Sequence, residues 1–299
     1  MYDIIIIGAG PAGISAGIYA VSRGKSTLVI EKNHIGGLVS NVSSVTHYTS
    51  VADDETGASF GEKLKGQAKF AGVEVITEEV TEVSLKGTIK TVTTDKGSYS
   101  AHKIIIANGT SPRKLGIPGE VELAGNGIGL NAPRDGKRYE GKNIYVVGGA
   151  DGAIKEALYL AQFAKELTII HFEEALGCIA EFKEKVAKTP NIKLCLKSRL
   201  VAVNGDGQVD VLTIKNVETG EEHLVADKGC GVFVYAGTLP NTALYTELEL
   251  ENGFIPVNEK METAIDGVYA AGDIRTKQVR QVATAVSDGA IAGINAAMS

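Results

Sequence analysis

The hydrophobic pattern of the first 31 residues alternates between apolar runs and a glycine-rich turn. Ile4 to Ile7 form a continuous apolar run, which predicts a strand covered on both faces in a parallel sheet. The turn GAGPAG follows and opens a predicted helix, and the run TLVIE then predicts a second strand that ends at Glu31. This order of strand, turn, helix and strand indicates a βαβ unit.

The same order recurs from about residue 142. The segment KNIYVVGGADGA predicts a strand and a glycine turn, an amphipathic helix is expected from about Ala153 to Ala164, and LTIIH predicts the next strand. Short strand-like segments fill the interval between the two units. A β-rich stretch covers residues 191–236, and a final segment resumes the first unit.

This layout predicts an α/β fold of two Rossmann-like, three-layer ββα dinucleotide-binding domains, with the second inserted into the first. We expect residues 1–112 and 243–299 to form the discontinuous first domain and residues 113–242 to form the second. Glycine and proline cluster at residues 113–119 and 237–242, where the chain is expected to cross between the domains.

Composition narrows the class of protein without identifying it. Of the 299 residues 44% are hydrophobic and 22% are charged, as is typical of a globular protein, and the net charge of −6 argues against a nucleic-acid partner. The uncharged run from Ile4 to Val21 is interrupted by Gly and Pro, and no basic segment precedes it. We therefore expect no membrane span and no membrane partner, and a cytoplasmic location.

The three cysteines do not form a motif. No pair among Cys178, Cys195 and Cys230 has the spacing of a zinc site or of a CxxC pair, so no metal site is predicted. Cys195 and Cys230 lie in apolar, strand-like runs and are expected to be buried, reduced thiols. Cys178 follows a loop, where we expect greater exposure, but no basic residue nearby would activate its thiol.

The first glycine turn carries the spacing of a dinucleotide-binding fingerprint. Gly8, Gly10 and Gly13 give G-x-G-x-x-G between the predicted strand and helix. The first glycine permits the tight turn, the second lets the backbone approach a pyrophosphate, and the third lets helix and strand pack closely. The helix N-terminus offers free N–H groups to the phosphates. Glu31 lies 23 residues after Gly8, where a carboxylate binds ribose hydroxyls.

The second glycine turn departs from this fingerprint. Ala150 occupies the second glycine position, where its methyl group crowds the closest approach of a pyrophosphate. Glu173 and Glu174 follow the next strand and would repel a 2′-phosphate, although either can accept hydrogen bonds from a free 2′-hydroxyl. The residues leave two alternatives open: this unit binds NADH, or it keeps the fold and binds no nucleotide.

Several long motifs, in order along nearly the whole chain, resemble the low-molecular-weight thioredoxin reductases, which are two-domain flavoproteins. GAGPAG with Glu31 is similar to their FAD fingerprint, and Gly36-Gly37-Leu38 resembles the GGQL turn that follows it. Residues 104–119 resemble the ATG-containing segment and its crossover, and GTLPNT resembles the return crossover. Residues 268–289 are close to the family's C-terminal FAD motif.

The resemblance implies FAD as cofactor, an FAD-binding domain at residues 1–112 and 243–299, and a degenerate NAD(P)H-binding-like domain at 113–242. It also implies a homodimer formed through the FAD domain. The residues that it carries over to FAD are Gly8, Gly10, Pro11, Ala12, Gly13, Glu31, Lys32, Gly36, Gly37, Leu38, Asn41, Ala107, Asn108, Gly109, Gly272, Asp273, Arg280, Gln281 and Val282.

Roles at the flavin follow from the same resemblance. It implies that Asp273 binds the ribityl chain and that residues 280–282 lie beside the pyrimidine end of the flavin, where a helix N-terminus stabilises negative charge that develops on reduction. Tyr48 and His47 fall in a loop that the family places near the flavin. Stacking by Tyr48 and proton donation by His47 are open alternatives to an ordinary loop tyrosine and histidine.

The departures from the family concern its reaction. Where the family carries a C-A-T-C-like redox pair before Asp-Gly, this chain has Asn131 and Arg134 at the two sulfur positions. Where the family carries an HRR motif and a further arginine for the 2′-phosphate of NADPH, this chain has His171, Phe172, Glu173 and Gly177. Disulfide exchange from this place, and tight binding of NADPH, are therefore not expected.

Three functional hypotheses remain open on the sequence. The first is an FAD oxidoreductase that works without its own disulfide and receives electrons from a protein such as ferredoxin or flavodoxin, or from NADH. The second is a ferredoxin–NAD(P) reductase-like or NADH-dependent flavin enzyme. The third belongs to another class, an FAD-binding regulatory or interaction protein with little turnover. The intact FAD motifs favour the first two, and the catalytic residues stay unknown.

Overall fold

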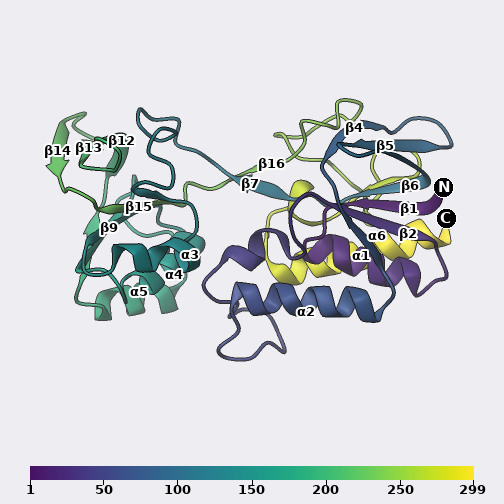
Figure 1. Ribbon diagram of the computed structural model, residues 1–299, viewed down its shortest axis with the longest axis horizontal. Helices are drawn as coiled ribbons and strands as arrows, with labels where there is room; N and C mark the ends of the chain where they lie inside the picture. Colours follow the sequence, from purple (N-terminus) through teal and green to yellow (C-terminus); the bar gives the residue numbers. More distant parts are fainter. The chain divides into compact units, whose positions relative to one another are not determined.

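A computed structural model describes residues 1–299 and divides the chain into two units (Figure 1). The first unit comprises residues 1–40, 44–111 and 239–299, and the second comprises residues 41–43 and 112–238. The two connections between the units contain strands β7 (Thr110–Pro112) and β16 (Thr238–Pro240), which pair with each other. Each unit is an α/β layer structure with its own parallel strands, which confirms the predicted fold class.

The first unit is built on a mixed sheet in the order β3-β2-β1-β6-β5-β4, with β17 added beside β6. Strands β3, β2, β1, β6 and β17 run parallel, whereas β4, β5 and β6 pair antiparallel. The strands are β1 (Tyr2–Ile7), β2 (Thr27–Glu31), β3 (Glu74–Thr77), β4 (Val80–Ser84), β5 (Lys90–Thr94), β6 (Ser98–Ile106) and β17 (Val268–Ala270). Ile4, Ile5 and Ile6 of β1 are fully buried, as a central parallel strand requires.

Three helices accompany this sheet, α1 (Pro11–Val21), α2 (Gly57–Phe70) and α6 (Val282–Met298) (Figure 1). Helices α1 and α6 pack unusually closely. A Cβ atom at Gly289 would lie 2.1 Å from the carbonyl oxygen of Ala12, and one at Gly293 would lie 2.4 Å from that of Ala16. Ser15 Oγ also donates a hydrogen bond to the Val286 carbonyl at 2.8 Å. These contacts fix the start of α6 relative to the β1–α1 turn.

The second unit contains a parallel sheet in the order β11-β10-β9-β15-β8 and an antiparallel sheet in the order β12-β13-β14. The strands are β8 (Ile128–Gly129), β9 (Asn143–Val147), β10 (Glu166–Ile170), β11 (Ile192–Cys195), β12 (Ser198–Asn204), β13 (Val211–Asn216), β14 (Glu222–Ala226) and β15 (Gly231–Val234). Its helices are α3 (Ala132–Asp135), α4 (Asp151–Leu160) and α5 (Ala180–Lys188). Short 3-10 turns, η1 (Gly37–Asn41), η2 (Gly136–Tyr139) and η3 (Gly272–Ile274), complete the fold.

Two local expectations need correction. The helix expected at about 153–164 spans Asp151–Leu160, because Ala150 in extended conformation caps its start and the chain leaves the helix through a turn in which Phe163 N–H donates to Leu160. The exposures expected for the cysteines are also wrong in part. Cys178 is buried and Cys195 is half-buried, whereas Cys230 is buried as expected. No helix combines the length and the apolar character that crossing a membrane requires.

The close contact between α1 and α6 leads to a prediction with a matched control. Gly289→Ala places a methyl group against the backbone of α1, so we expect the free energy of unfolding to fall by about 1–3 kcal/mol. Gly66→Ala in α2 meets nothing within 4 Å and should instead raise it by about 0.5–1 kcal/mol through helix propensity. Urea unfolding of both variants measures the difference, and equal effects would contradict the packing described here.

Candidate cofactor site and redox-pair positions

The turn from β1 to α1 is shaped by two glycines that no other residue can replace. Gly8 has a φ of +101°, and a Cβ there would lie 2.6 Å from the Ala107 carbonyl oxygen. A Cβ at Gly13 would lie 1.8 Å from the Gly8 carbonyl oxygen. The turn therefore packs directly on the end of β6, and α1 begins immediately beside it.

Gly10 is different, because the space beside it is open. The nearest atom to a Cβ at Gly10 is the carbonyl oxygen of Gly36, at 4.0 Å. Gly36 and Gly37 run alongside this opening, with Gly36 N–H donating to the Ala9 carbonyl at 2.9 Å. Gly10 is also the N-cap of α1, so the free N–H groups of the first turn of the helix follow directly after it. This arrangement leaves room for a phosphate at a helix N-terminus.

Glu31 lies at the end of β2 and is tied to the same turn. One carboxylate oxygen, Oε2, accepts the Ala9 N–H at 2.9 Å, and Oε1 accepts the Asn33 N–H at 2.9 Å. These bonds hold the carboxylate beside the glycine turn. Since a carboxylate oxygen can accept more than one hydrogen bond, Glu31 retains the capacity to bind ribose hydroxyls.

The segment from Ala107 to Gly109 is held by the returning chain. Asn108 Nδ2 donates to the Asn241 carbonyl at 3.1 Å, and Asn241 Nδ2 donates to the Asn108 carbonyl at 2.7 Å. The buried Tyr245 hydroxyl donates to Asn108 Oδ1 at 2.9 Å, and burial raises the pKa of this tyrosine. The Asn108 side chain thus fixes the loop, and a cofactor meets the surface of a loop that is already rigid.

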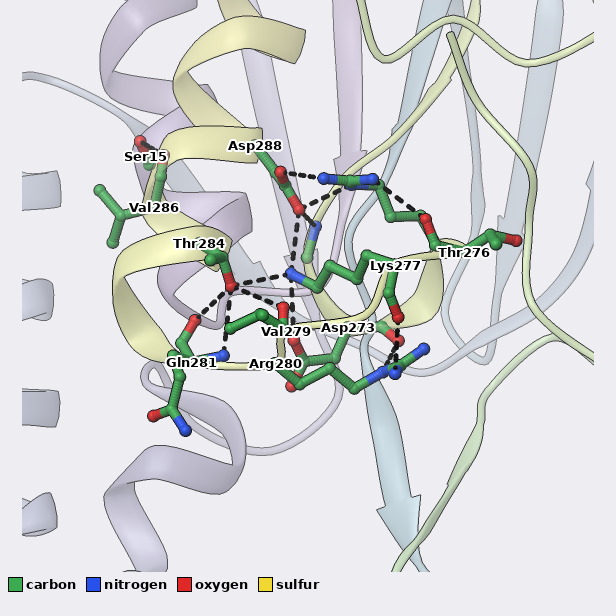
Figure 2. Close-up of polar contacts among 12 residues, drawn as sticks. Ser15, Asp273, Thr276, Lys277, Val279, Arg280, Gln281, Thr284, Val286 and Asp288 are labelled. Atoms are coloured by element: carbon green, nitrogen blue, oxygen red, sulfur yellow. Dashed lines mark hydrogen bonds and ion pairs between the residues drawn. The ribbon is translucent and has the colours of Figure 1, made fainter. Parts of the chain in front are cut away.

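The turn from Gly272 to Lys277 is organised around one carboxylate of α6 (Figure 2). Asp288 is 3% exposed, and its Oδ2 accepts the Gly272 N–H at 3.1 Å and Arg275 Nε at 2.8 Å. Its Oδ1 accepts Arg275 Nη2 at 2.6 Å, and Lys277 Nζ lies 3.0 Å from Oδ2. Burial opposes ionisation of Asp288, but the hydrogen bond from Arg275 and the charge of Lys277 outweigh it, so the pKa of this carboxyl is lowered.

Asp273 stands at the exposed side of that turn. Its Oδ1 is buried and accepts no hydrogen bond, although Lys277 Nζ lies 3.3 Å away, and the side chain as a whole remains 35% exposed. One edge of the carboxylate therefore faces the protein while the rest stays accessible. A buried carboxylate oxygen without a hydrogen bond is costly unless a ligand completes its environment.

Arg280, Gln281 and Val282 lead from this turn into α6. Arg280 Nη1 donates to the Lys277 carbonyl at 2.9 Å, and its guanidinium lies 4.1 Å above the ring of Phe254. Gln281 is the N-cap of α6, and its N–H donates to Thr284 Oγ1 at 3.2 Å. Because α6 starts at Val282, the free N–H groups of this helix lie at the position expected from the sequence.

The remaining residues expected at the cofactor have various surroundings. Pro11 and Ala12 form the first turn of α1, and Lys32 and Leu38 are exposed. Asn41 belongs to the second unit, where its carbonyl oxygen accepts a hydrogen bond from Asn131 Nδ2 at 3.1 Å.

The loop of residues 45–50 contains the two side chains whose roles at the flavin are open. Tyr48 packs edge-on against Phe60, with 5.7 Å between ring centroids. Exposed His47 lies with Nδ1 3.1 Å from Thr46 Oγ1. Neither observation assigns these two residues to the flavin.

In the second unit, the residues at the two expected sulfur positions stabilise a short helix. Asn131 is the N-cap of α3, and its Oδ1 accepts the Arg134 N–H at 2.9 Å. Arg134 donates from Nε and Nη2 to the two oxygens of Asp135, both at 2.9 Å. Asp135 also accepts the N–H groups of Leu130 and Asn131, and the hydrogen bond from Arg134 lowers the pKa of its carboxyl.

The glycine turn of the second unit is closed on one side. A Cβ at Gly148 would lie 2.4 Å from the Tyr235 carbonyl oxygen, and one at Gly149 would lie 2.5 Å from the ring of His171. Buried His171 contacts Glu173 Oε2 through Nε2 at 3.1 Å. The guanidinium of Arg199 lies 4.5 Å over the ring of Phe172. Sequence reasoning missed Arg199, because it reaches this place from β12.

Comparison with known proteins gives the family. The model of the pyridine nucleotide-disulphide oxidoreductase family matches residues 2–289. A thioredoxin reductase of Peptoclostridium acidaminophilum is 37% identical over 302 residues, which cover 99% of this chain and 96% of that protein. The chain belongs to the thioredoxin reductase family. Membership of this family identifies the chain as an FAD-dependent oxidoreductase.

Solved structures agree with this assignment. The thioredoxin reductase of Lactococcus lactis is 34% identical, with a TM-score of 0.95 and coverage of 99% of this chain and 98% of that one. A ferredoxin-flavin thioredoxin reductase of Clostridium acetobutylicum is 30% identical, with a TM-score of 0.54 and coverage of 99% and 96%.

FAD, the cofactor of the thioredoxin reductase family, fits the first unit. The open space beside Gly10 is the observation that a bound cofactor accounts for, and the accessible side of the Asp273 carboxylate offers it a further hydrogen-bond acceptor. When bound, FAD supplies hydride and electron transfer chemistry at its flavin ring. The groups of the chain that would hold it are the helix N-termini of α1 and α6, the carboxylates of Glu31 and Asp273, and the loop at Asn108. Sequence reasoning missed Arg275, Lys277 and Asp288, whose charges in an apolar helix-and-turn segment were the available signal.

The open space at Gly10 gives a test of where the cofactor binds. Gly10→Val suits the extended backbone of Gly10, and its Cβ would meet no protein atom closer than the Gly36 carbonyl oxygen at 4.0 Å, so the apoprotein should fold, while the Kd for FAD should rise at least about tenfold. The matched control is Ala150→Val, at the same turn position of the second unit. Titration of apoprotein with FAD by flavin fluorescence measures both, and an equal loss in the two variants would contradict the assignment.

The lowered pKa of Asp288 gives a pH prediction. Its ion pairs stabilise the fold above the unfolded-state pKa of about 3.9, and this contribution is lost as the pH falls through the lower folded-state value. Asp288→Asn removes the negative charge and one of the two acceptor oxygens that Arg275 and Lys277 share, and it should cost about 3 kcal/mol at pH 7. Urea unfolding at pH 7 and at pH 3 should show the gap between wild type and variant narrowing in acid. A gap independent of pH would overturn this assignment.

Proposed function

We propose that this chain is an oxidoreductase that passes electrons through FAD without a redox disulfide of its own and without depending on NADPH. The observation that carries the proposal is the structure of residues 131–135. Asn131 caps α3 and Arg134 binds Asp135, so both residues at the sulfur positions have structural roles and neither carries sulfur. Disulfide exchange needs a thiolate and a second, resolving sulfur.

The three cysteines offer no substitute for that pair. All three are free thiols rather than members of a disulfide. Burial raises the pKa of the Cys178 thiol, and burial together with nearby Asp227 raises that of Cys230 to about 12. Thiols with raised pKa values are poor nucleophiles at neutral pH.

The second unit supports the part of the proposal that concerns NADPH. Phe172 and Glu173 replace the residues that bind a 2′-phosphate in relatives with the HRR motif, and Glu173 adds a negative charge there. His171 holds the Glu173 carboxylate at 3.1 Å, a geometry that suits a free 2′-hydroxyl better than a phosphate. Arg199 is the nearest guanidinium described at this place, and it stacks on Phe172.

Electrons then enter from a reduced protein such as ferredoxin or flavodoxin, or from NADH, and leave to an acceptor that docks on the chain. Support for a ferredoxin comes from one similar structure, which is named a ferredoxin-flavin thioredoxin reductase. We also propose that residues 1–112 and 243–299 form the FAD-binding domain and that the chain forms a homodimer. Residues 113–242 form the degenerate nucleotide domain in this account.

Anaerobic reduction of the bound flavin tests the donor. NADH, NADPH and reduced ferredoxin are each added to the holoprotein, and the loss of flavin absorbance is followed with time. We expect rapid bleaching by ferredoxin or by NADH and slow bleaching by NADPH. Bleaching by NADH alone selects Glu173 as a ribose ligand, and Glu173→Arg should then reduce that rate. NADPH as the fastest donor would overturn the proposal.

A thioredoxin assay tests the absence of a disulfide mechanism. With thioredoxin, and with NADPH or the donor that bleaches the flavin fastest, the wild-type chain should show no reduction of the thioredoxin disulfide above background, because residues 131 and 134 lack sulfur. Asn131→Cys/Arg134→Cys restores a pair with the family spacing, and thiol titration reports whether its disulfide forms. Wild-type turnover equal to that of a cysteine-containing relative would contradict the claim.

A further inference from the structure

Lys277 is a buried cation within residues 268–289 to which no role in cofactor binding has been given above. Its side chain is 6% exposed, and its Nζ lies 3.0 Å from Asp288 Oδ2, 3.3 Å from Thr284 Oγ1 and 3.3 Å from Asp273 Oδ1 (Figure 2). A buried ammonium group is costly unless oxygens of opposite charge surround it. Lys277 therefore links two segments: the turn that contains Asp273, and the first turns of α6, which contain Thr284 and Asp288.

The charges around Lys277 balance only when Asp273 is counted. Arg275 binds both oxygens of Asp288, at 2.6 and 2.8 Å, so this pair is already neutral without Lys277. The remaining positive charge of Lys277 then needs a second acid. Among the residues in contact with its Nζ, Asp273 is that acid. The guanidinium of Arg280 lies over the ring of Phe254 and donates to the backbone carbonyls of Lys277 and Asp273, not to the Asp273 carboxylate.

Asp273 in turn depends on Lys277 for its orientation. Its Oδ1 is buried and has no hydrogen bond, so the ion pair with Lys277 is the interaction that this oxygen makes with the protein. The rest of the carboxylate remains accessible on the cofactor side of the turn. Without the ammonium group, the buried oxygen would face an uncompensated desolvation cost, and the side chain would rotate toward water.

We propose that Lys277 is a positioning residue for FAD, which holds the Asp273 carboxylate in its binding orientation while Asp288 and Thr284 hold Lys277. Lys277 acts through Asp273 and makes no contact with substrate in this account. The inference rests on FAD binding in the first unit and is independent of the electron donor and acceptor.

A double-mutant cycle on the Kd for FAD tests the proposal. Asp273→Asn, Lys277→Met and the double variant are prepared as apoproteins and titrated with FAD by flavin fluorescence. Lys277→Met should raise the Kd about tenfold, the size expected for a hydrogen bond to a charged group. In the Asp273→Asn background the same change should have less than about a twofold effect, because the residue through which Lys277 acts has been removed.

Three further variants separate positioning from general stability. Lys277→Arg keeps the charge and should retain most of the affinity, whereas Lys277→Gln keeps a donor without charge and should bind FAD as weakly as Lys277→Met. Lys260→Met, at an exposed lysine, is the surface control and should bind FAD as wild type does. Urea unfolding of each apoprotein reports stability separately, and Lys277→Gln replaces Lys277→Met in the cycle if the latter does not fold.

The Kd values for FAD of these variants decide whether Lys277 acts through Asp273. Loss of FAD affinity that disappears in the Asp273→Asn background supports the proposal. An equal loss in both backgrounds means that Lys277 does not act through Asp273, and it overturns the proposal. Unchanged affinity in Lys277→Gln overturns it as well.

Discussion

The turn at residues 272–277 of the first unit depends on the hydrogen bonds and ion pairs of the buried Asp288 carboxylate. This carboxylate lies on α6 and gathers the Gly272 N–H, the Arg275 guanidinium and the Lys277 ammonium group. Helix α6 is itself fixed by close packing of Gly289 and Gly293 against α1. A single anchored helix therefore sets both the start of α6 and the position of Asp273. The β1–α1 turn reaches the same helix pair from the other side, since α1 begins immediately after Gly10.

The second unit holds residues 131–135, where our proposal places the positions of the family's redox pair, in an ordered local structure. Residues 131–135 form a well-capped helical turn in which every polar group discussed has a partner. A capped turn with a bidentate Arg134–Asp135 pair is a stable local structure rather than a disordered remnant. This segment is therefore held in place without a disulfide. The first unit, in contrast, has open space beside Gly10 and a partly accessible carboxylate at Asp273, both of which suit FAD.

Local pattern was sufficient to predict the fold, but it was not sufficient for the contacts that shape the site. The apolar run of β1 and the glycines of its turn act over a few residues, so periodicity and spacing identify them. The bond from Tyr245 to Asn108 joins positions 137 residues apart, and Arg199 reaches Phe172 from a different strand. Lys277 was missed for a related reason: its partners lie on a turn and a helix, where no fixed spacing marks an ion pair. The register of such contacts is set by tertiary packing rather than by sequence neighbours.

An anaerobic reductive titration of the purified holoprotein tests the central claim most directly. Dithionite is added in measured portions, and the electron equivalents taken up per FAD are counted from the flavin spectrum. A flavoprotein with FAD as its only redox group takes up two electrons per flavin, whereas one that also holds a redox disulfide takes up four. The account predicts two. An uptake of four electrons per FAD would contradict it.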